Sequence, residues 1–411
     1  MNYVIIGNGV AGVTAAEAIR HIDARGQITM ISDESHPPYC RPMISNLLEG
    51  AVDVSRLPIR GPDFCDRLSI TPALGSRVTS LDVNARTVTT KGGQIFAYDR
   101  LLIAAGADPR PLDARGLDLK NIFFMRNIAQ VQAMLAALAH TRHALVLGGG
   151  LVGFKAAYSL LKRNIGVTML IRSGYPLSMQ VDETAGEMIQ QVLCDHGLTV
   201  RTGISVTAFE GGGRVQTAHL SDGSQVPCDM AIIGKGVFPA HGFVPTDRID
   251  TDAGILVDDQ MATSAPGIYA AGDVAEHIDI ARQKRWVNAI WPEAAAQGRV
   301  AGFNMAGRAL AYRGSLSRNV IRMFDTDVMT AGRVSPRDTD ETCRFFSAAD
   351  HRRQTYRKLV FEDQILVGFV MINQIEQGGV LASLIQSRTP VKISAHHLLD
   401  PGFNVSRLFD R

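Results

Sequence analysis

The stretch YVIIGNGVAGVTAAEAIR (residues 3–20) has a construction that residues 144–161, ALVLGGGLVGFKAAYSLL, repeat 141 positions later. Each copy is a short apolar run, then three glycines at G-x-G-x-x-G spacing, then an alanine-rich stretch typical of a helix. Each copy therefore predicts a strand that turns sharply into a helix. The glycines are Gly7, Gly9 and Gly12 in the first copy and Gly148, Gly150 and Gly153 in the second.

The strand-to-helix turn is suited to binding a phosphate group. The helix directs its free backbone N–H groups and the positive end of its dipole at one point, where a pyrophosphate can lie. In such a motif the first glycine allows the tight turn, the second lets the phosphate approach the backbone, and the third lets helix and strand pack closely. Two copies predict two dinucleotides, and FAD with NAD(P)H is the usual pair because a flavin accepts the hydride that a nicotinamide gives.

The end of the second strand differs between the two copies. A dinucleotide site carries an acid there, which binds the ribose hydroxyls, and QITMISDE after the first copy ends in Asp33 and Glu34. VTMLIRSG after the second copy has no acid but offers Arg172, which suits a 2′-phosphate and predicts that NADPH is accepted at least as well as NADH. The alternative for Arg172 is an exposed surface arginine.

Composition and charge exclude several classes of protein. The chain has 411 residues, 46% of them hydrophobic and 20% charged, and its net charge of +2 does not suggest a nucleic-acid surface. We find no signal peptide and no apolar run of the roughly 18 to 20 residues that a membrane span needs, so a cytoplasmic protein is expected. The five cysteines are scattered without a C-x-x-C pair, which predicts reduced thiols and no metal site.

Four further segments complete the pattern: HPPYCRPMIS (36–45), LLIAAGADPR (101–110), AIIGKGVFPA (231–240) and GIYAAGDVAE (267–276). With them the sequence resembles the pyridine nucleotide–disulfide oxidoreductase superfamily, in particular its rubredoxin and ferredoxin reductases and the flavin domain of NADH-dependent nitrite reductases. The segments are similar to the family's P-Y-x-R-P-x-L-S motif, its A-T-G-x-x-P-R hinge, its G-x-G-x-x-P stretch and its flavin-binding Gly-Asp. The hinge has Ala105 in place of the threonine.

The resemblance implies roles for residues in these segments. Arg41 and Pro42 would lie beside FAD, and Asp273 would hydrogen-bond its ribityl chain, with Gly272 permitting close approach of the backbone. A helix starting near Pro292 would aim its N-terminus at the flavin pyrimidine, which suits negative charge there. Further cofactor-binding residues are expected in the segments that join the domains: Ala105, Gly106, Arg110 and Gly236.

The resemblance also implies an α/β fold of two Rossmann-like dinucleotide-binding domains, with the NAD(P) domain inserted in the FAD domain. We expect residues 1–110 and 242–315 to form the FAD-binding domain and residues 111–241 the NAD(P)-binding domain. The tail, 316–411, is expected to form a small α+β domain. Within it, RKLVFEDQILVGFVMI predicts a hairpin around a Glu-Asp-Gln turn, and GGVLASLIQSRTPV predicts a helix that ends before Pro390. In relatives this region packs at a dimer interface or beside the flavin, so a homodimer or a complex subunit is expected.

Two residues depart from the family's pattern and are the candidate catalytic side chains. Relatives that reduce disulfides carry a cysteine pair, whereas here Cys40 stands alone beside Arg41, either as a redox thiol or as a small packing residue. Lys155 occupies a place where relatives usually have a glutamate that faces the nicotinamide–flavin junction. It could stabilise reduced flavin, hold an anionic substrate, or point to solvent. The neighbouring Phe154 would either cover the flavin or pack in the core.

The sequence therefore predicts an FAD-dependent NAD(P)H oxidoreductase in which hydride passes from nicotinamide to flavin and electrons leave to an external acceptor. The expected acceptor is an electron-transfer protein such as rubredoxin or ferredoxin, or a partner redox subunit. Two alternatives stay open. One is a disulfide, persulfide, peroxide or oxygen reductase that uses Cys40, and the other is a non-catalytic flavoprotein subunit of a redox complex.

Overall fold

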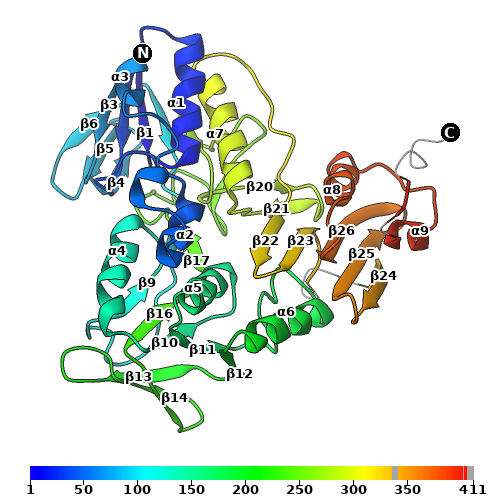
Figure 1. The fold of residues 1–411 in the computed structure, drawn as a ribbon. Coiled ribbons are helices and arrows are strands. Elements are labelled where there is room, and N and C mark those ends of the chain that lie inside the picture. Colours follow the sequence, from blue (N-terminus) through cyan, green and yellow to red (C-terminus); the bar gives the residue numbers. More distant parts are fainter. Residues whose placement is uncertain (336–340, 401, 405–411) are drawn as a thin grey trace.

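The computed structural model describes residues 1–335, 341–400 and 402–404, which form three lobes (Figure 1). Two lobes are built on five-stranded parallel sheets and the third on an antiparallel sheet. The predicted α/β fold class, with two Rossmann-like units and a small α+β domain at the C-terminus, is confirmed.

The first parallel sheet joins the beginning of the chain to a strand from beyond residue 260. Its strand order is β19-β7-β1-β2-β3. Helices α1 (Val10–Ile22) and α7 (Trp291–Met305) lie side by side beside it (Figure 1). They touch through their backbones, because a Cβ atom at Gly298 would lie only 2.1 Å from the carbonyl oxygen of Ala11. The strands are β1 (Asn2–Ile6), β2 (Gln27–Ile31), β3 (Ile70–Ala73), β7 (Arg100–Ile103) and β19 (Ile268–Ala270).

The second parallel sheet lies entirely between residues 122 and 233, with the order β12-β11-β10-β16-β9. Helices α4 (Ile128–Ala137), α5 (Leu151–Leu161) and α6 (Glu183–Asp195) accompany it. Strands β1 and β10 match end to end at an offset of 141 residues, and α1 and α5 begin at the same offset, as the repeat predicted. The strands are β9 (Ile122–Phe124), β10 (His143–Leu147), β11 (Gly166–Ile171), β12 (Leu198–Thr202) and β16 (Met230–Ile233).

A two-stranded ribbon joins the two lobes. Strand β8 (Ala107–Pro109), which follows the first sheet, pairs antiparallel with β17 (Val237–Pro239), which follows the second. The chain thus leaves and re-enters the first lobe at one place, as the predicted insertion requires. The domain limits at residues 110, 242 and 315 stay predictions.

Smaller elements decorate these lobes. Three antiparallel strands extend each parallel sheet's lobe, and β18, β20 and β21, which lie on either side of β19 in the sequence, form a third three-stranded sheet. The elements are α2 (Ile44–Glu49), α3 (Phe64–Arg67), β4 (Val78–Asp82), β5 (Thr87–Thr90), β6 (Ile95–Ala97), β13 (Val206–Glu210), β14 (Thr217–Leu220), β15 (Gln225–Pro227), β18 (Ile255–Leu256), β20 (Ala275–Asp279) and β21 (Lys284–Trp286), with 3₁₀ turns η1 (Arg41–Met43), η2 (Val54–Arg56) and η3 (Leu138–His140).

The C-terminal lobe is an antiparallel sheet of order β22-β23-β26-β25-β24 with two helices. The predicted hairpin is confirmed as β25 and β26, which turn at Asp363, and the predicted helix is α8, which ends at Ser387 before Pro390. The elements are β22 (Arg318–Met323), β23 (Thr326–Gly332), β24 (Cys343–Asp350), β25 (Thr355–Glu362), β26 (Ile365–Ile372), α8 (Gly378–Ser387) and α9 (Ala395–Leu399).

One buried carboxylate makes two contacts between this lobe and the second sheet's lobe. Asp182, at the N-cap of α6, accepts a hydrogen bond from the Tyr356 hydroxyl at 2.7 Å and an ion pair from the Lys358 ammonium at 2.9 Å. The side chains of Asp182 and Lys358 are each only 12% exposed, so water screens this contact little.

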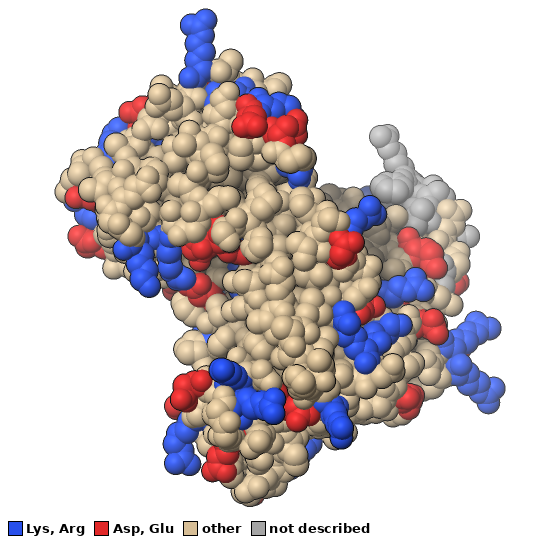
Figure 2. All heavy atoms as spheres, turned by 60° about the vertical axis from the view of Figure 1, so that its left-hand side comes forward, with Lys and Arg blue, Asp and Glu red and all other residues tan. Residues whose placement is uncertain are grey.

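The surface charges follow no single sign. Figure 2 shows lysine and arginine side chains interspersed with aspartate and glutamate over one face. Among the helices of the described residues, none has the length and apolarity to cross a bilayer.

Candidate functional site

Both glycine motifs form the same tight turn at the carboxyl end of a central strand. Gly7 has φ +109° and Gly148 has φ +105°, a left-handed conformation that side chains strongly disfavour. Each also lies against the next strand's end: a Cβ atom at Gly7 would lie 2.1 Å from the Ala104 carbonyl oxygen, and one at Gly148 would lie 2.3 Å from that of Gly234. Only glycine fits at either position.

The other two glycines of each motif have the surroundings that their predicted roles require, close helix packing for the third and space for a phosphate at the second. A Cβ atom at Gly12 would lie 2.0 Å from the Gly7 carbonyl oxygen, and one at Gly153 would lie 1.9 Å from that of Gly148, so the helix packs directly on its turn. A Cβ atom at Gly9 or Gly150 would meet nothing within 4 Å. These middle glycines are the N-cap residues of α1 and α5, and no side chain caps either helix, so backbone N–H groups face open space.

The two acids after β2 lie in different surroundings. Asp33 is 53% exposed and pairs loosely with Arg77 at 3.6 Å, which leaves its carboxylate accessible to a ligand. Glu34 is only 12% exposed and accepts hydrogen bonds from the Tyr39 hydroxyl at 2.7 Å and the Arg41 guanidinium at 2.6 Å. Of the two predicted ribose-binding acids, Asp33 is therefore the accessible one, and Glu34 orients Arg41.

A chain of charged groups links the segments that resemble flavin-binding motifs. Arg41, in η1 with Pro42, donates its second guanidinium hydrogen bond to the carbonyl oxygen of Arg126 at 2.7 Å. The Arg126 guanidinium in turn lies 3.7 Å from the Asp273 carboxylate, with side chains that are 24% and 23% exposed. Burial and the charge of Arg41 lower the pKa of Arg126. This arrangement gathers two cations around Asp273.

The sequence interpretation missed Arg126. It belongs to the segment after β9, a short strand whose sequence, NIFFMRN, carries no glycine or acid to mark it. Only its place after a strand of a parallel sheet could have indicated a role, because parallel sheets bind their ligands at the carboxyl ends of the strands. Arg126 also lies beside predicted Gly106, since a Cβ atom there would lie 3.4 Å from its Nη2 atom.

The segment around Asp273 lies against the first turns of α1 and α7. Gly272 donates its backbone N–H to the Gln297 side-chain oxygen of α7 at 2.8 Å. A Cβ atom at Gly272 would lie 3.3 Å from the Cβ of Ala11 in α1 and 3.5 Å from that of Ala294 in α7. The α7 helix begins at Trp291, with Pro292 in its first turn, close to the predicted start. The N-termini of α1 and α7 thus flank Asp273.

The predicted hinge residues lie in and beside the β8–β17 ribbon. Arg110 donates its backbone N–H to the Gly236 carbonyl oxygen at 3.0 Å, while its side chain is exposed. Ala105 and Gly106 connect β7 to the ribbon and are partly buried. These residues therefore belong to the connection between the lobes, and Arg110, Gly236 and Gly106 stabilise it through backbone hydrogen bonds.

The candidate catalytic residues Cys40 and Lys155 come from different lobes and influence each other's charge. Cys40 precedes η1, and Lys155 lies on α5 one turn before Ser159, which hydrogen-bonds the Ser45 carbonyl oxygen at 2.9 Å. Burial raises the pKa of the Cys40 thiol, although the backbone N–H of Met43 and Lys155 act against it. Burial lowers the pKa of Lys155, and Cys40 opposes this. Lys155 is partly buried, and which of its three predicted roles it has stays a prediction.

Phe154 is 1% exposed and belongs to a core cluster with residues of α2 and α4. A side chain that covers the flavin would be exposed here, so Phe154 packs in the core. All five cysteines lie in the described residues and are free thiols.

Arg172 follows β11 by one residue and its side chain is exposed. Within residues 1–335, 341–400 and 402–404, the structure gives its guanidinium no carboxylate within ion-pair distance. The position fits a ligand-binding arginine and also a surface one.

The residues present fit both dinucleotides. The glycine turns leave the space outside Gly9 and Gly150 open, and helix N-termini face that space. In the first lobe an accessible acid, Asp33, stands where ribose hydroxyls are bound.

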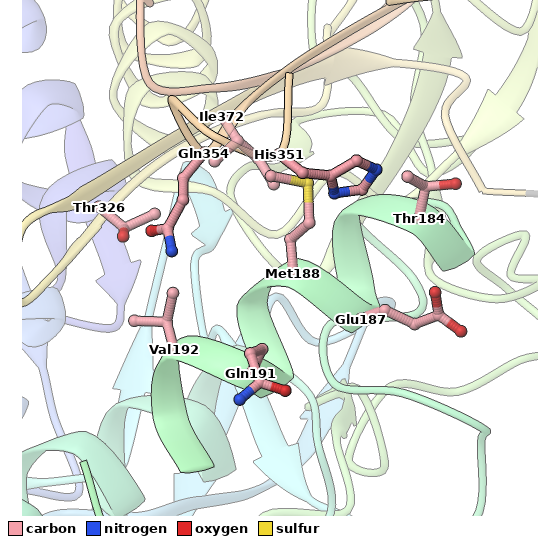
Figure 3. Close-up of a pocket in the computed structure, with 9 residues that line it drawn as sticks. All are labelled: Thr184, Glu187, Met188, Gln191, Val192, Thr326, His351, Gln354 and Ile372. Atoms are coloured by element: carbon pink, nitrogen blue, oxygen red, sulfur yellow. The ribbon is translucent and has the colours of Figure 1, made fainter. Parts of the chain in front are cut away.

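A separate groove of about 320 Å³ lies between α6 and the C-terminal sheet (Figure 3). Figure 3 shows Met188 rising from α6 toward His351 and Gln354 of the C-terminal lobe. None of its lining residues belongs to either glycine motif or to the charged chain around Asp273. We therefore assign it no part in dinucleotide binding.

Comparison with known proteins agrees with this geometry. The family model described as pyridine nucleotide-disulphide oxidoreductase matches residues 1–298, and the rubredoxin NAD+ reductase C-terminal domain matches residues 318–389. The assimilatory nitrate reductase electron transfer subunit of Bacillus subtilis is 28% identical over 97% of this chain, which spans about half, 51%, of that relative.

Two further proteins match over nearly their whole length. Subunit epsilon of the NADH-dependent phenylglyoxylate dehydrogenase of Aromatoleum evansii is 30% identical over 94% of this chain and 92% of the relative. The crystal structure of the covalent putidaredoxin reductase–putidaredoxin complex has a TM-score of 0.90 at 23% identity, covering 99% of this chain and 98% of that one, which shows a shared fold. The chain belongs to the pyridine nucleotide-disulphide oxidoreductase family, as its motifs predicted.

Proposed function

We propose that this protein is an FAD-dependent NAD(P)H oxidoreductase that passes electrons to an external protein acceptor. The observation that carries the proposal is the pair of equivalent glycine turns, each at the carboxyl end of its own parallel sheet, in lobes joined by the β8–β17 ribbon. Bound together, FAD and NAD(P)H supply hydride transfer, a chemistry that no side chain offers.

The chain's own residues bind and orient the flavin nucleotide in this proposal. The N–H groups at the start of α1 hold the pyrophosphate, and Asp33 accepts hydrogen bonds from the ribose hydroxyls. Asp273 accepts hydrogen bonds from the ribityl hydroxyls, and the Arg126 guanidinium, 3.7 Å away, holds this carboxylate in place. The N-terminus of α7 supplies positive potential near the pyrimidine end of the ring.

The junction between the lobes holds Lys155 and Cys40. Lys155 supplies a partly desolvated positive charge, which favours added negative charge at this place. The raised pKa of Cys40 keeps its sulfur as a neutral thiol near pH 7, and such a thiol is a poor nucleophile. Both features favour electron transfer to an external acceptor over a thiol relay.

The acceptor is proposed to be a small electron-transfer protein or a partner redox subunit. Two similar proteins support this class of acceptor. One is an electron transfer subunit of nitrate reductase. The other is a ferredoxin–NAD(+) reductase component of a biphenyl dioxygenase system, 34% identical over 66% of this chain. We also propose a cytoplasmic location, which the five unpaired cysteines support.

Absorption spectroscopy under anaerobic conditions tests the proposal. The purified protein is expected to be yellow with about one FAD per chain, and NAD(P)H should bleach the flavin band. Oxidised rubredoxin or ferredoxin added next should restore the band and become reduced itself. A colourless protein, or flavin that stays oxidised under excess NADH and NADPH, would contradict the enzyme and favour a non-catalytic subunit. Bleaching that only disulfides or peroxide reverse would favour the Cys40 alternative.

A further inference from the structure

The two glycine turns can be compared residue by residue through the register of their sheets. At the end of the central strand, Ile6 pairs with Ile31 and Ile103 in the first sheet. The corresponding residue of the second sheet, Leu147, pairs with Leu170 and Ile233. Two residues beyond these partners stand Asp33 and Ala105 in the first lobe, and Arg172 and Lys235 in the second.

The contacts of the turn support the same correspondence. A Cβ atom at Gly7 would lie 3.4 Å from the backbone nitrogen of Ala105, and a Cβ atom at Gly148 would lie 3.4 Å from that of Lys235. Lys235 thus adjoins the second turn as Ala105 adjoins the first. The sequence interpretation singled out the neighbouring Gly236 and passed over this lysine.

The two sites differ in charge at these equivalent positions. The first turn is flanked by an acid and a neutral residue, and the second by two cations. Among the residues that the structure describes, neither Arg172 nor Lys235 has a carboxylate within ion-pair distance. Lys235 is partly buried, and burial and the charge of Arg172 both lower its pKa. The two cations repel each other, and a ligand that brings negative charge near both would offset this repulsion.

We propose that Lys235 binds the pyrophosphate of the nicotinamide dinucleotide, from the side of β10 opposite to Arg172. This inference rests on the proposed function, which places NAD(P)H at the second turn. The adenosine ribose is bound at the end of the second strand, here β11, which is the side of Arg172. Lys235 follows β16 on the other side of β10. The pyrophosphate lies between them over the glycine turn, so Lys235 reaches a group that NADH and NADPH share.

Binding constants of the oxidised holoprotein test this assignment without any turnover. Isothermal titration calorimetry would give Kd for NAD+ and for NADP+ in wild type, Lys235→Ala and Lys235→Arg. The alanine variant copies the first site, where Ala105 stands. It should raise both Kd values by the same factor, roughly ten- to a hundredfold, since one charge-assisted contact is lost. Lys235→Arg should restore most of the affinity for both nucleotides.

A matched control is Lys162→Ala, because Lys162 is an exposed lysine at the C-cap of α5, away from the turn. It should leave both Kd values unchanged. Equal affinities in Lys235→Ala and wild type would overturn the inference. Loss of NADP+ affinity alone would also overturn it, because Lys235 would then read the 2′-phosphate.

The flavin spectrum and far-UV circular dichroism verify that each variant is folded, and Lys235→Gln serves as a second neutral variant if the alanine variant is not. Wild type that binds neither nucleotide would contradict the proposed function itself. Wild type that binds both, with an unaffected Lys235→Ala, contradicts only the role of Lys235.

Discussion

The guanidinium of Arg126 lies 3.7 Å from the carboxylate of Asp273, which brings a residue of the second lobe to the motif that resembles the family's flavin-binding Gly-Asp. In the proposed function, the flavin site therefore depends on a residue from the second lobe.

Asp273→Ala should weaken FAD retention, because it removes an acceptor for the ribityl hydroxyls. One hydrogen bond to a charged group corresponds to about a tenfold or larger rise in the Kd of FAD. The measurement is the release of fluorescent FAD when the holoprotein is diluted. Asp222→Ala is the control, since Asp222 is also paired with an arginine, Arg201, but on the surface of the second lobe. FAD retention equal to that of wild type would remove the ribityl assignment.

Cys40→Ser should keep more than half of the NAD(P)H-dependent dye reduction. Burial raises the pKa of Cys40 above its usual value of about 9, so the thiolate fraction near pH 7 is small, and no second cysteine is bonded to it. The assay is steady-state reduction of a dye acceptor by wild type and variant at equal flavin content. A long-wavelength thiolate–flavin band that forms on reduction of wild type and is missing in Cys40→Ser would instead support the thiol-based alternative.

Lys155→Met should stabilise the oxidised holoprotein at pH 7, raising Tm by about 1–3 °C, because it removes a partly desolvated cation. Burial lowers the pKa of Lys155 below its usual 10.5. Between the lowered and the usual value the unfolded chain binds more protons than the folded one, so wild-type stability gains with rising pH. The advantage of Lys155→Met should therefore shrink as the pH approaches 10.5.

Thermal unfolding of both proteins from pH 7 to 10.5 measures this effect, with Lys162→Met as the control at the exposed C-cap of the same helix. A variant that is less stable than wild type at pH 7, or a difference in Tm that does not change with pH, would show that Lys155 is compensated in the folded protein.

Much of the fold could be predicted because its signals are local. A glycine motif between an apolar run and a helix fixes a strand, a turn and a helix within 20 residues, and the repeat marks two such units. The alternation of apolar and polar residues on both sides of Asp363 predicted the hairpin in the same way. Steric contacts confirm why Gly7 and Gly148 had to be glycine.

The charges of the sites could not be predicted in this way, because they depend on which strand ends lie side by side. Arg126 meets Asp273 across 147 positions, and Lys235 joins Arg172 only through the order β11-β10-β16. Glu34 matched the ribose-binding pattern as well as Asp33 did, and the sequence did not reveal its contacts with Tyr39 and Arg41. Sequence spacing carries no information on such pairings.

Arg172→Ala should lower the preference for NADPH over NADH. Arg172 stands at the position where Asp33 stands in the first site, and an acid there would repel a 2′-phosphate. NADPH-using relatives carry a second arginine several residues later, near Ser178 here, so Arg172 is expected to act on the 2′-phosphate without that partner. One such contact is worth about 1.5–3 kcal/mol, a 10- to 150-fold effect on the ratio of kcat/KM values.

Kinetics with both cofactors would measure this ratio in wild type, Arg172→Ala and Arg172→Asp. The aspartate variant copies the first site and should favour NADH more strongly than the alanine variant, because it adds repulsion to the lost contact. Arg142→Ala is the control, since Arg142 is an exposed arginine just before β10. It lies at the amino end of the sheet's strands, opposite to the carboxyl end where Arg172 stands. If Arg172→Ala and Arg142→Ala leave the ratio equally unchanged, Arg172 is a surface residue that does not read the phosphate.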